Sequence, residues 1–137
     1  MDKRKILTIG ILGALAVALG AMGAHLLKAK VQMGLMTADQ LDGFEKGVKY
    51  QMYHVLAMLL LVVMHKQGEN KYFMWAYAFF FWGIILFSGS LYFLTTRNLL
   101  GMEWLKFLGP VTPLGGVCFI IGWLCLGISM LKSDKNK

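Results

Sequence analysis

Long stretches without a charged side chain alternate along the sequence with shorter segments that carry all of the charge. The charged residues fall at positions 2–5, 28–49, 66–71, 97–106 and 132–137. Since a helix needs about 20 mostly apolar residues to cross a bilayer, the pattern is typical of an integral membrane protein. It predicts an all-α, four-helix transmembrane bundle with spans at residues 6–26, 48–65, 72–94 and 110–131.

The first span resembles a signal peptide at its start, where Lys3, Arg4 and Lys5 precede the apolar run. The run is nevertheless about 20 residues long, enough to cross the membrane, so we expect an uncleaved helix. Small residues recur in it every four positions, at Ala16, Gly20 and Ala24. This spacing lets another helix approach closely.

The second span is preceded by the longest polar connection, which contains its own helix signal. Thr37 followed by Gln40 forms a capping-box pattern, which predicts a helix beginning near Ala38. Leu41, Phe44 and Val48 then recur at helical spacing. We expect an amphipathic segment in the interface that either runs or bends into the second span, and a bend would be easiest at Gly43 or Gly47.

The third and fourth spans carry signals of a different kind. The third is rich in aromatic residues, and the sequence predicts interfacial anchors at Tyr72, Trp75 and Tyr92. The fourth begins with Thr112 and Pro113, typical of an N-cap followed by the first helical residue. No connection is long enough to separate two folding units, so we expect one transmembrane domain over residues 1–137.

Composition supports the membrane interpretation. The chain is 58% hydrophobic and 15% charged, whereas a soluble domain has about a quarter of its residues charged. The net charge of +7 is spread over every loop and forms no basic stripe, which favours anionic lipid headgroups over nucleic acid as the partner. The basic N-terminus before the first span predicts that both termini lie in the cytoplasm.

The candidate site is the polar first half of the second span. It contains Tyr50, Gln51, Tyr53 and His54, side chains that must be hidden against protein or used for function when a helix enters a membrane. Near it we place three further candidates for ligand binding or helix packing: His25 from the first span, and Ser88 and Ser90 from a small polar notch in the third.

Several kinds of chemistry are disfavoured. The apolar spans contain no Asp or Glu, which argues against a proton-coupled carrier or an ion pump. Cys118 and Cys125 lie two helical turns apart inside the last span, and their spacing matches no zinc or redox motif. No motif for nucleophilic catalysis or phosphate binding is present. We therefore expect no enzyme activity, no metal and no cofactor.

The histidines leave two interpretations of the candidate site. His25 and His54 belong to the same leaflet and could together hold a haem or a quinone. His54 should, however, lie about 10 Å deeper than His25 at the helical rise per residue, which fits poorly. We favour a hydrogen bond from His54 across helices, to the serine notch or to an exposed carbonyl.

One face of the second span leaves a similar choice. Tyr50, His54, Met58, Leu61 and His65 share this face, which could line a groove for a lipid or a small amphiphile. An ordinary helix–helix seam with polar ends is the preferred interpretation.

With these residues in view, the chain resembles the domain of unknown function 423 family, small bacterial inner-membrane proteins related to animal transmembrane protein 256. The resemblance is carried by GALAVALGAMGAHLL at 13–27, FEKGVKYQMYHVLAMLL at 44–60, FSGSLYFL at 87–94 and PVTPLGGVCFIIGWL at 110–124. It implies a four-helix protein of the bacterial inner membrane and no established activity. The family's characteristic positions would correspond to His25, Tyr50, Gln51, Tyr53, His54, Ser88, Gly89, Ser90, Pro113, Gly115, Gly116 and Trp123.

The leading functional prediction is a non-enzymatic accessory or scaffold subunit that packs with lipid, with another membrane protein or with itself. The small residues of the first span and the missing intramembrane acids motivate it. The alternatives are a redox protein using His25 and His54 with haem or quinone, and an oligomer that lets a small solute pass.

Overall fold

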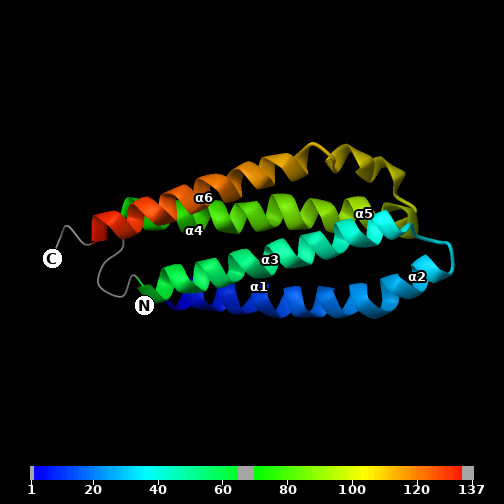
Figure 1. Ribbon diagram of the computed structural model, residues 1–137, viewed down its shortest axis with the longest axis horizontal. Coiled ribbons are helices and arrows are strands. Elements are labelled where there is room, and N and C mark those ends of the chain that lie inside the picture. The colour runs from blue at the N-terminus through cyan, green and yellow to red at the C-terminus, as the bar shows by residue number, and fades with distance from the viewer. Residues whose placement is uncertain (1, 65–69, 134–137) are drawn as a thin grey trace.

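The computed structural model describes residues 2–64 and 70–133, and this part of the chain folds into a bundle of long helices (Figure 1). Four of them are long and apolar enough to cross a membrane: Lys3–Gln32, Ala38–Met64, Lys71–Leu100 and Glu103–Lys132. The prediction of a four-helix transmembrane protein is confirmed. The first, third and fourth helices run beyond both ends of their predicted spans, and the second begins at Ala38, ten residues before its predicted span. A helix of about 30 residues measures about 45 Å and so exceeds the hydrocarbon core, which is about 30 Å thick.

Three of the four long helices contain a segment that departs from α-helical geometry. The first consists of α1 (Lys3–Met22), the π-helical η1 (Gly23–Leu27) and α2 (Lys28–Gln32). The second is the uninterrupted α3 (Ala38–Met64). The third consists of α4 (Lys71–Gly83), the π-helical η2 (Ile84–Gly89) and α5 (Ser90–Leu100). The fourth joins the 3₁₀-helical η3 (Glu103–Leu108) to α6 (Val111–Ser133).

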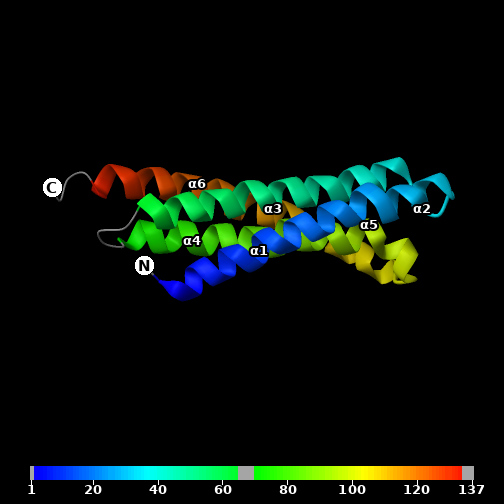
Figure 2. The same cartoon turned by 90° about the horizontal axis from the view of Figure 1, so that it is seen from below.

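Helix α3 is the centre of the arrangement. It packs against α1 on one side and against α4, η2 and α5 on another, while α6 packs mainly against α4 and η2. Helices α3 and α6 run in the same direction, opposite to α1 and α4 (Figures 1 and 2). The polar segment of the second span is therefore carried by the helix with the most neighbours.

The small residues of the first helix pack against α3. Ala16 is only 1% exposed. A Cβ atom added to Gly20 would lie 3.3 Å from Val48, and one added to Gly23 would lie 3.3 Å from Phe44. The predicted close approach is thus made within the chain at Ala16 and Gly20, whereas Ala24, the third residue of the predicted stripe, is exposed.

Helices α4 and α6 interlock through two reciprocal pairs of glycine and phenylalanine. The ring of Phe119 lies over Gly83, where an added Cβ atom would overlap it. The ring of Phe80 lies over Gly122, where an added Cβ atom would be 2.7 Å away. Each helix therefore inserts one aromatic ring into a gap that only glycine leaves open on the other.

The beginning of α3 confirms the capping box and decides between the two predicted courses of the helix. The capping box forms as expected, because Gln40 donates its backbone N–H to Thr37 Oγ1 at 3.1 Å and Thr37 donates its N–H to Gln40 Oε1 at 2.9 Å. The segment runs into the second span without a bend, since α3 continues unbroken through Gly43 and Gly47. These glycines instead admit neighbours: added Cβ atoms would lie 2.8 Å from Thr95 and 2.9 Å from Tyr92.

Two predictions for the spans are wrong. Thr112 does not cap a helix, because α6 already begins at Val111 and the Thr112 hydroxyl is bound to Ser90 Oγ at 2.6 Å. Tyr92 is not an interfacial anchor, because its hydroxyl points into the bundle and donates to Gln51 Oε1 at 2.6 Å. Hydropathy alone does not show that the hydroxyl groups of Thr112 and Tyr92 bind other helices of the bundle.

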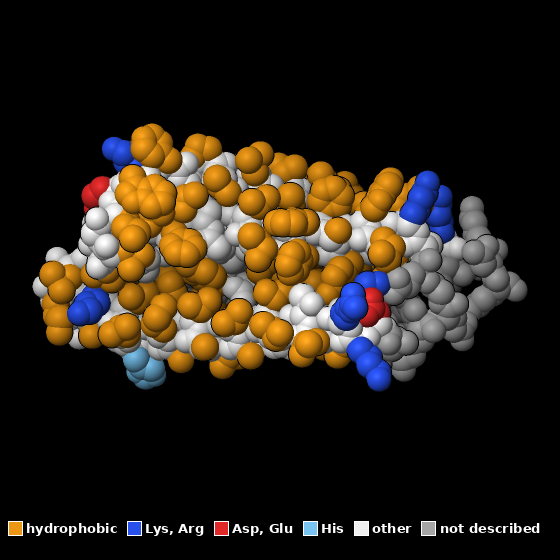
Figure 3. All heavy atoms as spheres, turned by 180° about the vertical axis from the view of Figure 1, so that it is seen from behind, with side chains coloured by type: hydrophobic (Ala, Val, Ile, Leu, Met, Phe, Trp, Pro, Cys, Tyr) orange, Lys and Arg blue, Asp and Glu red, His pale blue; other side chains and the backbone are white. Residues whose placement is uncertain are grey.

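The surface agrees with a membrane location. Hydrophobic side chains cover the middle of the face in Figure 3, and the Lys, Arg, Asp and Glu side chains gather at its two ends. In the connection after α5, Trp104 and Phe107 are 62% and 74% exposed while Leu105 is buried. This is the arrangement that the predicted interfacial connection requires.

Candidate functional site

The polar segment of α3 faces two different sides of the bundle. Gln51 and His54 are 3% and 4% exposed, whereas Tyr50 and Tyr53 are 41% and 55% exposed. Gln51 points towards α1 and α5, and His54 points towards α6. The predicted site therefore separates into two clefts, one on each side of α3.

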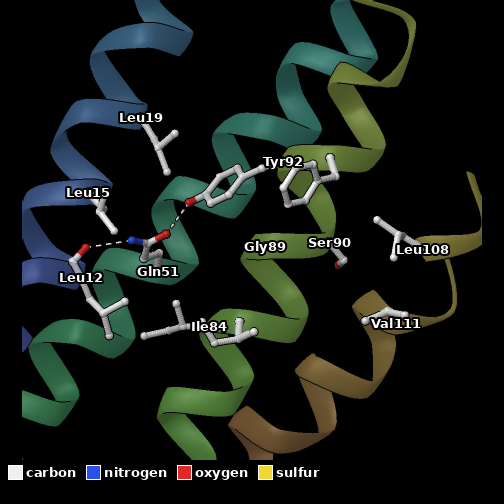
Figure 4. A pocket seen from close by; sticks show the side chains of 12 residues that line it. Leu12, Leu15, Leu19, Gln51, Ile84, Gly89, Ser90, Tyr92, Leu108 and Val111 are labelled. Atoms are coloured by element: carbon white, nitrogen blue, oxygen red, sulfur yellow. Dashed lines mark hydrogen bonds between the residues drawn. The ribbon is translucent and has the colours of Figure 1, made fainter. Parts of the chain in front are cut away.

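Gln51 joins three helices by hydrogen bonds (Figure 4). Its Nε2 donates to the backbone carbonyl of Leu12 on α1 at 2.8 Å, and its Oε1 accepts from the hydroxyl of Tyr92 on α5 at 2.6 Å. A buried amide in an apolar bundle needs such partners, because an unsatisfied polar group is costly there. Gln51 is thus a cross-link between α1, α3 and α5.

An apolar cleft of about 410 Å³ opens beside Gln51. Figure 4 shows three leucines of α1 on one side of Gln51 and the residues of η2, α5 and α6 on the other. The lining residues are Leu12, Leu15, Leu19, Gln51, Ile84, Ile85, Gly89, Ser90, Tyr92, Phe93, Leu108 and Val111. Its few polar groups are bound to protein, so the cleft offers a ligand mainly apolar surface.

In the structure, the serine notch holds helices together. Ser88 is 0% exposed and donates its hydroxyl to the backbone carbonyl of Gly47 at 2.6 Å. Ser90 bonds to the Thr112 hydroxyl at 2.6 Å and donates to the carbonyl of Phe87 at 3.0 Å. Ser88 therefore binds α3, but its partner is a backbone carbonyl and not the side chain of His54.

His54 makes a hydrogen bond across helices, with a partner that we did not predict. The indole N–H of Trp123 on α6 donates to His54 Nε2 at 3.1 Å. Because Nε2 accepts, Nδ1 carries the proton of the neutral ring and donates to the carbonyl of Tyr50 at 2.6 Å. Neither expected partner is used across helices, since Ser88 is bound to Gly47 and the carbonyl that His54 binds belongs to Tyr50 of its own helix.

Aromatic rings enclose the imidazole of His54. The ring of Phe119 stacks on it with centroids 3.5 Å apart and an interplanar angle of 8°. Phe80 and Trp123 lie 5.5 Å and 6.0 Å away. Sequence reasoning missed Phe119 and Trp123 as neighbours of His54. The only available signal was an indole donor placed within an otherwise apolar span.

The structure does not bring His25 and His54 into one site. His25 is exposed on η1, while both ring nitrogens of the buried His54 are bound to protein. Within residues 2–64 and 70–133, no group of three His, Cys, Asp or Glu side chains could hold a metal ion. His65, the last member of the predicted α3 face, lies outside the described residues, and Met58 and Leu61 on that face are both 0% exposed.

The second cleft is a groove of about 700 Å³ between α3 and α6. Tyr50 lies at one side of it, with its ring 4.7 Å from Phe87 between centroids. The lining residues are Tyr50, Tyr53, His54, Phe87, Pro113, Gly116, Val117, Phe119, Ile120 and Trp123. The volume lies within the range of about 300–1,000 Å³ that small-molecule sites occupy. Aromatic side chains dominate this groove.

Replacing Trp123 by phenylalanine tests the bond to His54. We expect Trp123→Phe to destabilise the bundle by about 1 kcal/mol, because His54 Nε2 loses its donor in apolar surroundings. Thermal unfolding in detergent micelles measures the change. Trp82→Phe is the control, because Trp82 is similarly exposed, at 55% against 48% for Trp123. Equal losses in the two variants would contradict the assigned hydrogen bond.

Comparison with known proteins places these features in a family. The family described as "Protein of unknown function (DUF423)" matches residues 19–116. This chain belongs to that family. The match includes the polar segment of α3 and the serine notch, and it ends before Phe119 and Trp123.

Relatives of the chain are membrane proteins by name. A UPF0382 membrane protein of Staphylococcus epidermidis is 43% identical over 126 residues, which cover 89% of this chain and 93% of the relative. A UPF0382 membrane protein of Staphylococcus aureus is 44% identical, with the same coverage of both chains. The UPF0382 inner membrane protein YgdD of Escherichia coli is 35% identical over 92% of this chain and 88% of its own length. No solved structure matches the chain.

The family and the four spans together confirm the predicted location in the bacterial inner membrane as a multi-pass protein. The orientation with both termini in the cytoplasm stays a prediction.

Proposed function

We propose that this protein is a non-enzymatic accessory protein of the membrane that holds one lipid molecule in the groove between α3 and α6. The observation that carries the proposal is the groove itself. It is open at the surface of a transmembrane bundle, measures about 700 Å³ and is lined mostly by aromatic and aliphatic side chains.

The hydrogen bonding of the polar residues supports a non-enzymatic role. The buried side chains of Gln51, His54 and Ser88 are each bound to another part of the protein. A general base or a nucleophile needs a group aimed at the substrate. These residues hold helices together, so their hydrogen-bonding groups are already used within the protein.

The length of the groove supports a lipid chain as the occupant. On α6 its lining residues extend from Pro113 to Trp123, ten residues along the helix. At about 1.5 Å per residue this is about 15 Å, or half of a hydrocarbon core of about 30 Å. The groove therefore has the length of the apolar part of one leaflet.

Filling the groove from within tests the proposal. Gly116 lines the groove, and an added Cβ atom would meet only the ring of Phe87, at 3.9 Å. We expect Gly116→Leu to fold normally and to retain lipid at least about tenfold more weakly, because the new side chain occupies the space of the lipid. Native mass spectrometry after gentle detergent extraction measures the bound lipid.

Gly10→Leu is the matched control, because Gly10 is exposed on α1 and an added Cβ atom has no neighbour within 4 Å. This variant should retain lipid as the wild type does. Equal lipid retention by Gly116→Leu and the wild type would remove the groove as the binding site.

A further inference from the structure

We infer that the lipid held between α3 and α6 is an anionic phospholipid whose phosphate lies against Lys49 and the hydroxyl groups of Tyr50 and Tyr53. The inference rests on the proposed function and adds the chemical class of the ligand. It follows from the charge of Lys49, which directly precedes the first α3 residue of the groove, from the direction of the two helices and from the two tyrosine hydroxyl groups in the lining.

Lys49 is an available cation at the start of the apolar part of α3. It is exposed, and no charged residue follows it within α3. Lys46, one turn earlier, is already paired with Asp42 at 2.7 Å. Glu45 is also one turn from Lys49, but Lys49 forms no ion pair with it or with any other described residue. One positive charge thus remains for a ligand.

The direction of the helices places this charge at one end of the groove. Helices α3 and α6 run the same way (Figure 1). Lys49 directly precedes Tyr50, the first residue of α3 that lines the groove, so it lies at the end of the groove nearer the start of α3. Lys49 and Tyr53 are four residues apart and share a face of α3. A lipid with its headgroup at Lys49 would therefore extend its chain along α6 from Pro113 towards Trp123.

The two tyrosines supply neutral donors beside the cation. Both line the groove, and their rings lie 6.0 Å apart. Neither hydroxyl has a hydrogen-bond partner among residues 2–64 and 70–133, whereas the hydroxyl of Tyr92 is bound to Gln51. An ammonium group with two phenol donors suits the oxygen atoms of a phosphodiester.

The same charges disfavour a zwitterionic headgroup. Phosphatidylcholine carries a trimethylammonium group beside its phosphate, and Lys49 would repel it. Phosphatidylglycerol carries a neutral glycerol in that place. Near a membrane surface, one lysine contributes roughly 1 kcal/mol towards an anionic lipid, so we expect a preference of about fivefold.

The test compares two lipids that differ only in the headgroup. Purified protein in detergent is titrated with palmitoyl-oleoyl phosphatidylglycerol or with palmitoyl-oleoyl phosphatidylcholine, and native mass spectrometry counts the bound lipid. We expect the wild type to bind phosphatidylglycerol about fivefold more tightly. Lys49→Gln should lose this preference and bind phosphatidylcholine as before. Lys28→Gln, which changes an exposed lysine at the same end of the bundle, should keep it.

Gly116→Leu separates the failure of this inference from the failure of the proposed function. If it weakens both lipids while the wild type binds them equally, the groove holds lipid and the headgroup assignment is overturned. Tighter binding of phosphatidylcholine by the wild type would overturn it as well, because the tyrosines would then bind the choline group. If Gly116→Leu changes neither lipid, or if no lipid binds, both proposals are overturned.

Discussion

Gly115→Ala is expected to unfold or severely loosen the bundle, although it adds a single methyl group. The new Cβ atom would lie 2.7 Å from both Cα and Cβ of Phe87 and would overlap its backbone nitrogen. These atoms belong to η2, so no side-chain rotation relieves the contact, and the two helices must separate. We expect a loss of at least about 3 kcal/mol, the upper end of the usual cost of overpacking.

Gly116→Ala is the matched control for this change. It adds the same methyl group one residue later, where the nearest atom is Cδ2 of Phe87 at 3.9 Å. Thermal unfolding in detergent, together with the size-exclusion profile, compares the two variants. A Gly115→Ala protein as stable as Gly116→Ala would show that η2 and α6 lie further apart than described.

The sequence was sufficient to predict the transmembrane helices because their length is a local property. An uncharged stretch that crosses hydrocarbon needs no knowledge of its neighbours, and the capping box of Thr37 and Gln40 is formed by residues three positions apart. Close approach at Ala16 and Gly20 was also predictable, since small residues permit it wherever they recur. Which helix these residues approach was not predictable, because their partner, α3, lies far along the chain.

Long-range partners decide what the sequence left open or predicted wrongly. Gly43 and Gly47 were the easiest places for a bend, yet they serve the close packing of Thr95 and Tyr92 against α3. Tyr92 has the position of an interfacial aromatic residue, yet it turns inward to Gln51. In each case the side chain facing the residue decides its role.

In the candidate site, too, the neighbours of each side chain decide its role. The polar segment of α3 was predictable as a place where hydrogen-bonding groups must be satisfied. Its division between two sides was not, because it depends on which way each residue of α3 points in the bundle. Trp123 carries a donor in an apolar span, and only the packing of α6 against α3 shows that His54 receives it.

The two π-helical segments lie against the polar end of α3. In η1, Gly23 packs against Phe44, and in η2, Ser88 donates to the carbonyl of Gly47. A π-helical turn inserts an extra residue and redirects the side chains that follow, and such turns are frequent at functional sites. Here the turn in η2 precedes Ser90 and Tyr92, which contact α6 and α3 respectively.

Gln51→Leu is expected to cause the second large loss of stability, about 2 kcal/mol. The leucine has a similar volume, but it removes the bonds that join α3 to Leu12 and to Tyr92. The hydroxyl of Tyr92 would be left without its acceptor in an apolar interior, which costs about 1–3 kcal/mol. Gln32→Leu, which changes an exposed glutamine of α2, should have little effect.

Removing the stranded hydroxyl should restore part of the loss. In the double variant Gln51→Leu with Tyr92→Phe, both partners of the bond become apolar, so no buried group is left unsatisfied. We expect the double variant to be more stable than the sum of the two single losses predicts, by about 1 kcal/mol. Thermal unfolding of the four proteins in one detergent measures this coupling. Strictly additive losses would mean that Gln51 and Tyr92 act independently, and α3 and α5 would then be held together by other contacts, such as that between the rings of Phe44 and Tyr92.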